Sequence, residues 1–230
     1  MRRDYLSLVP AYNEAERISY VLAGLRGKIP ILVVDDGSTD DTAAIARQSG
    51  AEVLSNDQNE GKGVALKKGF KWGLDRGVKA IITLDADGQH DPSEVPLFIA
   101  AYEAGEGELI IGRRDFSKMP WQRRFANQFG KWSLSKALGV EIYDNQSGYR
   151  LISRKLLERI TLTRSGFELE VEMVVEAVIQ KIPIGSVDIQ TIYATQITSH
   201  FHPLKDSFQF IRMVFKAYTR RKEAEFKEPQ

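Results

Sequence analysis

The sequence predicts an α/β fold in which helices flank a mostly parallel central sheet. Short apolar runs alternate with helical patterns through the first half of the chain, which is typical of strand–helix–strand units. The apolar runs are continuous, as in strands that are buried on both faces. Polar clusters follow these runs, at the strand ends where open sheets bind ligands. The 230 residues, 43% of them hydrophobic, suffice for one compact core.

The elements of the first half follow from periodicity. A strand is expected at residues 5–9, and then a helix whose apolar residues Ile18, Val21, Leu22 and Leu25 have the spacing of an amphipathic helix. The unit repeats three times, and a further strand, "ELIIG", follows at 108–112. The expected strands are "ILVVDD", "AEVL" and "KAIITLD", and the helices after them cover residues 39–48, 64–74 and 94–102.

The second half begins with a basic segment. Residues 113–136 hold seven Lys or Arg and one acid, Asp115. A helical pattern at 171–178, an extended stretch at 184–193 and a last helix at 205–221 follow. We expect a single domain over 1–222, made of the halves 1–112 and 113–222, with a loose tail at 223–230.

Composition excludes several classes of protein. The net charge of +1 gives no overall field that favours nucleic acid. The chain has no cysteine, which excludes disulfides and thiolate sites. The first residues lack the pattern of a secretion signal, and no apolar window approaches the length of a membrane span. We therefore expect a cytoplasmic protein whose membrane contact, if any, is peripheral.

An acidic cluster, "DADGQHD", follows the expected strand that ends near Leu84. Asp85, Asp87 and Gln89 offer oxygen ligands of the kind that Mg²⁺ and Mn²⁺ prefer. Because Mg²⁺ usually takes few protein carboxylates and completes its shell with phosphates, the cluster indicates a phosphorylated ligand. The alternative is a solvated helix start, an interpretation that we adopt for residues 91–94.

Four motifs, in this order, resemble the nucleotide-binding half of the family 2 glycosyltransferases with a GT-A (Rossmann-like) fold. They are "PAYNE", "VVDDGSTDDT", "NEGKGVALKKGF" and "LDADGQHDP", within residues 5–112. The motifs "DADGQH", "DNQSGYR" and "GFELEVEM" are similar to those of the polyprenol-phosphate glycosyltransferases, the dolichol-phosphate mannose synthase group, and extend the resemblance to about residue 195. The resemblance implies metal-dependent, inverting transfer of a sugar from a nucleotide-sugar donor (GDP-mannose or a UDP-sugar) to a polyprenyl (dolichyl or undecaprenyl) phosphate at the cytoplasmic membrane face.

The resemblance assigns the donor to residues 1–112. Its positions for the nucleoside are Pro10, Tyr12, Glu14, Val34 and Asp36. A tyrosine ring suits stacking on a base, and a carboxylate accepts hydrogen bonds from ribose hydroxyls. The alternative is that the acids and hydroxyls of these loops only cap helices.

The remaining donor positions concern the diphosphate. Lys62 lies between two glycines before a helix, where backbone N–H groups suit phosphate oxygens, although an ordinary loop is the alternative. The resemblance places Asp85, Ala86 and Asp87 against the donor, with Asp85 on the ribose or the metal, and makes Asp87 and Gln89 ligands of Mg²⁺ or Mn²⁺. The cation would neutralise charge on the leaving nucleoside diphosphate.

The resemblance assigns the acceptor to the basic half. The acceptor residues are Arg114, Arg123, Asn127 (where the group has serine), Ser147 and Arg150. Arginines offset the repulsion between a phosphate acceptor and an anionic donor. Asp87, Arg114, Arg123 and Asp144 are the catalytic candidates, with Asp144 as general base if the acceptor is an alcohol; a phosphate acceptor needs little deprotonation.

Several positions stay open between two interpretations. Trp121, Phe125, Phe129 and Trp132 fall on one helical face, which meets either lipid or the core. The helix at 205–221 has the same two alternatives, with a separate transmembrane partner as a further possibility. Glu170 and Glu172 align with a Gln-x-Glu pair of the group or face solvent. His200, where the group has lysine, is either an acceptor-side cation or an exposed loop residue.

Two other functions compete with the leading hypothesis. The donor half is compatible with transfer to a saccharide or protein hydroxyl. It is also compatible with a non-catalytic nucleotide-binding regulator. A dehydrogenase is disfavoured, because no G-x-G-x-x-G motif follows the first strand.

Overall fold

The computed structural model describes residues 2–115, 121–144, 146–190, 192, 214–215 and 217–222, without the side chains of residues 121–123, 125 and 126. The strands are β1 (Tyr5–Ala11), β2 (Ile31–Asp35), β3 (Glu52–Ser55), β4 (Ala80–Thr83), β5 (Leu109–Arg114), β6 (Arg150–Ser153) and β7 (Ile184–Ile189). The helices are α1 (Ile18–Leu25), α2 (Thr42–Gln48), α3 (Lys62–Asp75), η1 (Pro92–Glu94), α4 (Val95–Glu103), α5 (Trp121–Leu138), α6 (Arg154–Arg159) and α7 (Glu168–Ile179).

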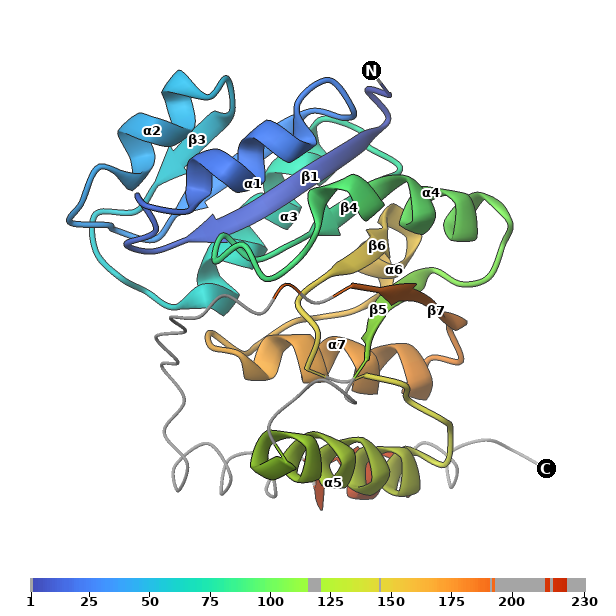
Figure 1. Cartoon of the computed structure of the whole chain (residues 1–230). Coiled ribbons are helices and arrows are strands. Elements are labelled where there is room, and N and C mark those ends of the chain that lie inside the picture. The colour runs from blue at the N-terminus through green and yellow to red at the C-terminus, as the bar shows by residue number, and fades with distance from the viewer. Residues whose placement is uncertain are drawn as a thin grey trace.

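The strands form one sheet in the order β3-β2-β1-β4-β6-β5-β7 (Figure 1). Four of the neighbouring pairs are parallel, and β6 is antiparallel to both β4 and β5. The parallel strands have the continuous apolar sequences that burial on both faces requires; Leu6, Leu8 and Val9 of β1 are all fully buried. The α/β fold with a mostly parallel sheet is therefore confirmed.

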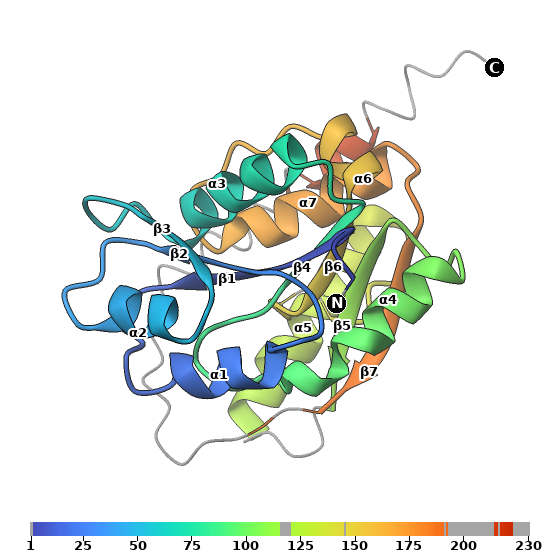
Figure 2. The same ribbon diagram turned by 90° about the horizontal axis from the view of Figure 1, so that it is seen from above.

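Two layers of helices cover the sheet (Figure 2). One core contains residues of α1, α2 and α4 packed on one face of the sheet, such as Val21, Ala46 and Phe98. The other contains residues of α3, α5, α6 and α7 on the opposite face, such as Phe70 and Val174. Alternate residues of one strand supply both cores, because successive side chains of a strand point to opposite faces.

The structure differs from the expected elements mainly around β6. This strand and α6 were not predicted, since "RLIS" is a short run behind a polar motif. Strand β7 ends at Ile189, before the expected limit of 193. Residues 214–215 and 217–221 of the expected last helix are described and are helical, as is residue 222. The remainder of that helix lies outside the described residues, as do His200 and the tail 223–230. Within the described ranges, no helix combines the length and apolar character needed to cross a bilayer.

Candidate active site at the strand ends

The ends of β4 and β5 meet at the start of β6. Arg150, the first residue of β6, pairs with Thr83 of β4 and with Ile111 of β5. Because β6 is antiparallel to both neighbours, it begins at the edge where they end. The polar loops that follow β1, β2, β4 and β5 therefore converge at one edge of the sheet, and the motif "DNQSGYR" crosses it on the way into β6.

The acidic loop after β4 is closed by its own hydrogen bonds. The backbone N–H of Gln89 donates to Asp87 Oδ1 at 2.9 Å, and Gln89 Nε2 donates to Asp87 Oδ2 at 2.6 Å. The backbone N–H of Asp85 donates to Nδ1 of the buried His90 at 3.3 Å. Gly88 supplies the positive φ of 76° that the turn requires. Ala86 is buried, and Asp85 and Asp87 are partly exposed.

Lys62 joins this loop to α7. Its Nζ lies 2.7 Å from Asp85 Oδ1 and 3.1 Å from Glu170 Oε1, and the Lys62 side chain is 15% exposed. Glu170 is in the first turn of α7 and its side chain is 8% exposed. One ammonium group is thus shared by two carboxylates that lie far apart in the sequence.

The charges of the site shift one another's pKa values. Burial alone would lower the pKa of Lys62, but Asp85 and Glu170 raise it above its usual value. Burial opposes ionisation of Asp85, yet Lys62, His90 and Arg114 lower its pKa. Burial, and then the neighbouring charge of Asp85, raise the pKa of Asp87 to about 6. Burial lowers the pKa of His90 to about 4, so its imidazole is neutral near pH 7.

The donor set of this loop suits a hard divalent cation. A carboxylate and an amide lie in contact at Asp87 and Gln89, and a half-turn of the Gln89 amide would exchange Nε2 for Oε1 beside Asp87. Within the part of the chain that the structure describes, no group of three or more His, Cys, Asp or Glu could hold a metal ion. This partial set is compatible with Mg²⁺ or Mn²⁺, which complete their shells with water and phosphate oxygens.

The residues predicted to hold the nucleoside differ in accessibility. Tyr12 is 39% exposed at the end of β1, so its ring is open to a base. Glu14 is partly exposed and accepts a hydrogen bond from Arg17 Nη1 at 3.0 Å. Pro10 and Val34 are buried within their strands, which leaves their side chains no open face for a ligand.

Asp36 holds the loop before α3. Its Oδ1 accepts hydrogen bonds from Asn56 Nδ2 at 2.6 Å and from the backbone N–H of Glu60 at 3.0 Å, and its Oδ2 accepts from the N–H of Gly61 at 2.7 Å. The side chain is buried. The structure thus gives Asp36 the capping role at the start of α3 that was the alternative for this loop, and its contact with a nucleoside stays a prediction.

The glycines that flank Lys62 allow backbone to pack on backbone. A Cβ atom on Gly63 would lie 2.6 Å from the carbonyl carbon of Ser165, and one on Gly61 would lie 2.8 Å from the Ser165 oxygen. The N–H of Val64 donates to that oxygen at 3.3 Å. Of the backbone N–H groups around Lys62, those of Gly61 and Val64 are thus already bonded within the chain, and Lys62 supplies the side-chain cation of this loop.

Arg114 and Asp144 form a bidentate ion pair at the end of β5. Arg114 Nε donates to Asp144 Oδ2 at 2.7 Å, and Nη2 donates to Oδ1 at 3.0 Å. The backbone N–H groups of Gln146 and Ser147 also donate to Oδ1. Asp144 is 1% exposed. A carboxylate with this many donors is better suited to orienting Arg114 than to accepting a proton from a substrate.

The other predicted acceptor residues lie around this pair or outside the described side chains. Arg150 is buried and donates from Nε to the Ser147 carbonyl at 2.7 Å and from Nη1 to the Glu170 carbonyl at 2.5 Å. The hydroxyl of Ser147 is buried without a hydrogen-bond partner. Asn127 is partly exposed on α5, and the side chain of Arg123 lies outside the described part of the structure.

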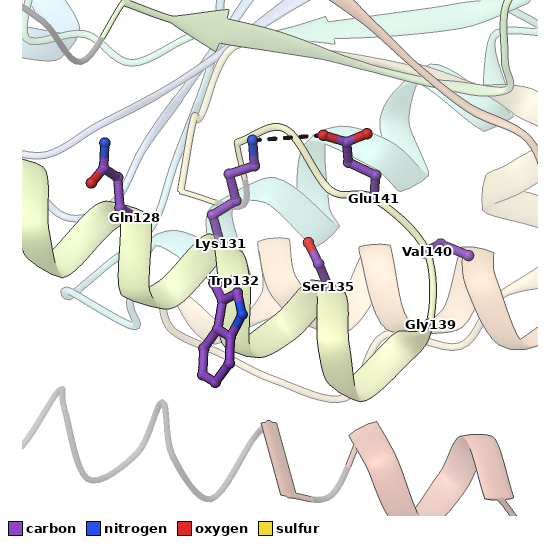
Figure 3. Close-up of a pocket in the computed structure, with 7 residues that line it drawn as sticks. All are labelled: Gln128, Lys131, Trp132, Ser135, Gly139, Val140 and Glu141. Atoms are coloured by element: carbon purple, nitrogen blue, oxygen red, sulfur yellow. Dashed lines mark ion pairs between the residues drawn. The ribbon is translucent and has the colours of Figure 1, made fainter.

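Two open hollows lie on the acceptor side. One, of about 330 Å³, is beside the ion pair at the end of β5 and is lined by Arg113, Arg114, Asp115, Asp188 and Ile189. The other, of about 560 Å³, lies along α5 (Figure 3). In it Lys131 points toward Glu141 over an ion-pair distance of 3.9 Å, and the ring of Trp132 points away from the pair. The titratable groups gather at the strand ends, and we assign the site there.

Sequence analysis missed one contact and left another open. A Cβ atom on Gly148 would lie 2.5 Å from Asp85 Oδ2, so this glycine makes room for the carboxylate, and no signal in a single sequence marks that approach. Glu170 precedes Met173, Val174 and Ala177, all buried, at positions i+3, i+4 and i+7. That spacing indicates a carboxylate on the buried face of α7 and could have argued against the solvent-facing alternative for Glu170.

Comparisons with known proteins agree with these motifs. The family model for glycosyl transferase family 2 matches residues 8–161. A polyprenol monophosphomannose synthase from Mycolicibacterium smegmatis is 35% identical over 69% of this chain, and the match spans 64% of that relative, less than two thirds of its length. An undecaprenyl-phosphate mannosyltransferase from Micrococcus luteus is 34% identical over 73% of this chain and 75% of its own length.

A solved structure shows the same fold. Glucosyl-3-phosphoglycerate synthase from Mycobacterium tuberculosis, in a crystal with Mn²⁺, UDP-glucose and phosphoglyceric acid, superposes with a TM-score of 0.72 at 22% identity, covering 96% of this chain and 80% of that one. That protein is a GT-A enzyme, so the GT-A fold implied by the resemblance is confirmed. The chain belongs to glycosyltransferase family 2, whose members transfer a sugar from a nucleotide-sugar donor.

Proposed function

We propose that the chain is a metal-dependent, inverting glycosyltransferase that moves a sugar from a nucleotide sugar to a polyprenyl phosphate at the cytoplasmic face of a membrane. The observation that carries the proposal is the arrangement of charge at the strand ends. An acidic loop whose carboxylate and amide suit a divalent cation lies on the same edge as the Arg114–Asp144 pair, and the hollow beside that pair is lined by Arg113 and Arg114 together with Asp115 and Asp188. The names of the Mycolicibacterium and Micrococcus relatives support a polyprenyl acceptor.

The residues of the chain divide the work between donor and acceptor. Asp87 and Gln89 would hold Mg²⁺ or Mn²⁺, which would offset the charge that develops on the departing nucleoside diphosphate. Tyr12 offers a face to the base, and Lys62 is the nearby cation for the diphosphate. A phosphate oxygen of the acceptor forms its bond to the anomeric carbon as the bond to the donor phosphate breaks. That oxygen is already ionised, so the chain needs to orient it rather than deprotonate it.

The surface of the acceptor half supports contact with a membrane. Phe129 and Trp132 of α5 are 49% and 57% exposed, and Phe215 is 70% exposed near the C-terminus. Lys136 Nζ lies 5.1 Å from the ring of Trp132. Exposed aromatic rings beside lysines are typical of helices that lie in the interfacial region of a bilayer. The side chains of Trp121 and Phe125, predicted for the same face, lie outside the described residues.

The decisive experiment is a screen of GDP-mannose, UDP-glucose and UDP-N-acetylglucosamine against a short polyprenyl phosphate with Mg²⁺ or Mn²⁺. Asp87→Ala should abolish turnover. Asp91→Ser is the matched control, because the side chain of Asp91 caps η1 by accepting from the N–H of Ser93, and serine keeps that cap. Transfer to a sugar hydroxyl with no transfer to the lipid phosphate would refute the proposal that the acceptor is a polyprenyl phosphate. Turnover that survives both a chelator and Asp87→Ala would refute the proposed dependence on a divalent cation.

A further inference from the structure

Lys62 occupies an electrostatically unusual position. It is the first residue of α3, where the helix dipole disfavours a positive charge, and its side chain is largely buried. Two carboxylates offset both costs, Asp85 at 2.7 Å and Glu170 at 3.1 Å. The ring of Phe167 lies 5.4 Å from the same ammonium group.

Of the two carboxylates, Asp85 belongs to the acidic loop, whereas Glu170 belongs to α7. Asp85 is two residues from Asp87, so a cation at Asp87 and Gln89 would lie close to the ammonium that now pairs with Asp85. Two like charges at such short range repel, and more strongly in a partly buried site than in water. Lys62 would then have to leave Asp85 or weaken binding of the cation.

Glu170 offers Lys62 a partner that it can keep. Its backbone is fixed by Arg150, whose Nη1 donates to the Glu170 carbonyl at 2.5 Å. The preceding loop is fixed by Glu172, which accepts hydrogen bonds from the backbone N–H groups of Thr163 and Arg164 at 2.8 and 3.0 Å. The backbone that carries Glu170 is therefore held by hydrogen bonds that do not involve Asp85.

We propose that Glu170 is a positioning residue that retains the ammonium group of Lys62 when a divalent cation and a nucleoside diphosphate occupy the acidic loop. Lys62 pairs with both Asp85 and Glu170 while the loop holds no cation; when the cation binds, it leaves Asp85 for the diphosphate and keeps its pair with Glu170. This inference rests on the proposed function, because it requires the metal site at Asp87 and Gln89. It goes further in assigning Glu170 a part in binding that cation.

The test measures Mn²⁺ binding directly, without turnover. Loss of the free-Mn²⁺ signal in electron paramagnetic resonance gives the Kd in the presence of GDP and, separately, of UDP. Glu170→Gln should weaken Mn²⁺ binding about tenfold, within the range of coupling between contacting charged groups. Glu168→Gln removes a carboxylate from the same helix turn with no ion pair to Lys62, and should change the Kd by less than about twofold.

A double-mutant cycle separates this role from a structural one. In a Lys62→Met background, Glu170→Gln should cost less than about a third of the factor that it costs in the wild type. Equal losses in both backgrounds would overturn the proposal, since Glu170 would then act through its own charge or through folding. A second comparison keeps Lys62 as it is. Glu170→Asp retains the negative charge, and its Kd for Mn²⁺ should lie within about threefold of the wild-type value. If Glu170→Asp binds Mn²⁺ as weakly as Glu170→Gln does, the proposal is likewise overturned.

The two levels of inference fail in different ways. If the wild type binds no Mn²⁺ with either nucleotide, the metal in the proposed function is wrong, and the role of Glu170 is wrong with it. If the wild type binds Mn²⁺ and Glu170→Gln binds it equally well, only the role of Glu170 is wrong. Thermal unfolding by circular dichroism checks that each variant is folded.

Discussion

Gly148→Ala should displace the carboxylate of Asp85 in the acidic loop while leaving the fold in place. The new Cβ would lie 2.5 Å from Asp85 Oδ2 and 2.9 Å from Oδ1, against an ordinary contact distance of 3.4 Å or more. The Gly148 carbonyl accepts a hydrogen bond from Thr83 Oγ1 at 2.8 Å, which keeps the backbone from retreating. The carboxylate of Asp85 must therefore move by roughly 1 Å, and we expect a loss in rate of up to about 100-fold, the size that a 1 Å misplacement can cause.

The matched control for Gly148→Ala is Gly73→Ala in α3. Its Cβ would lie 2.7 Å from Ile81 Cδ1, a comparable overlap, but inside the core and away from the strand ends. Each substitution should cost about 1–3 kcal/mol in overpacking, offset at Gly73 by roughly 1 kcal/mol of helix propensity. The assay is kcat/KM for the donor, with the free energy of unfolding from urea titration. Gly148→Ala with wild-type kcat/KM would refute the reasoning.

Three further predictions follow from contacts at the site. Asp36→Ala should lower the free energy of unfolding by about 3 kcal/mol, because three donors lose their acceptor; urea unfolding that shows less than about 1 kcal/mol would contradict this. Asp144→Asn should lower kcat on the order of tenfold or more with little change in KM for the donor, because Arg114 loses a charged, bidentate partner; a loss confined to donor KM would argue against that role. Trp132→Ala should weaken co-sedimentation with anionic vesicles several-fold without lowering the melting temperature, and unchanged sedimentation would place the ring away from the bilayer.

The fold of the first half could be predicted from local pattern alone. Each parallel strand there is a continuous apolar run, and each helix shows its own periodicity, so boundaries were off by only a few residues. The place of β6 could not be predicted in this way. A four-residue strand carries little periodic signal, and its insertion between β4 and β5 is a matter of long-range pairing.

Part of the candidate site could likewise be predicted from local sequence, and part could not. The acidic loop was predictable, because carboxylates behind a buried strand are chemically conspicuous, and the structure brings Asp87 and Gln89 into hydrogen-bond contact. The partners of these groups were not predictable. That Lys62 pairs with Asp85 and with a residue on α7 depends on how distant elements pack.

The Arg114–Asp144 pair also has a consequence for how such enzymes diversify. The segment from 115 to 143, which includes α5, leaves the sheet beside Arg114 and returns beside Asp144, and the ion pair joins the two points. Leu134, Leu138 and Ile142 of this segment pack in the core, so it is the exposed positions of the segment that can change without disturbing the strands on either side. With the acceptor assigned to this half of the chain as proposed, changes at exposed positions of residues 115–143 would alter which acceptor is recognised. The donor residues of the first half would stay the same.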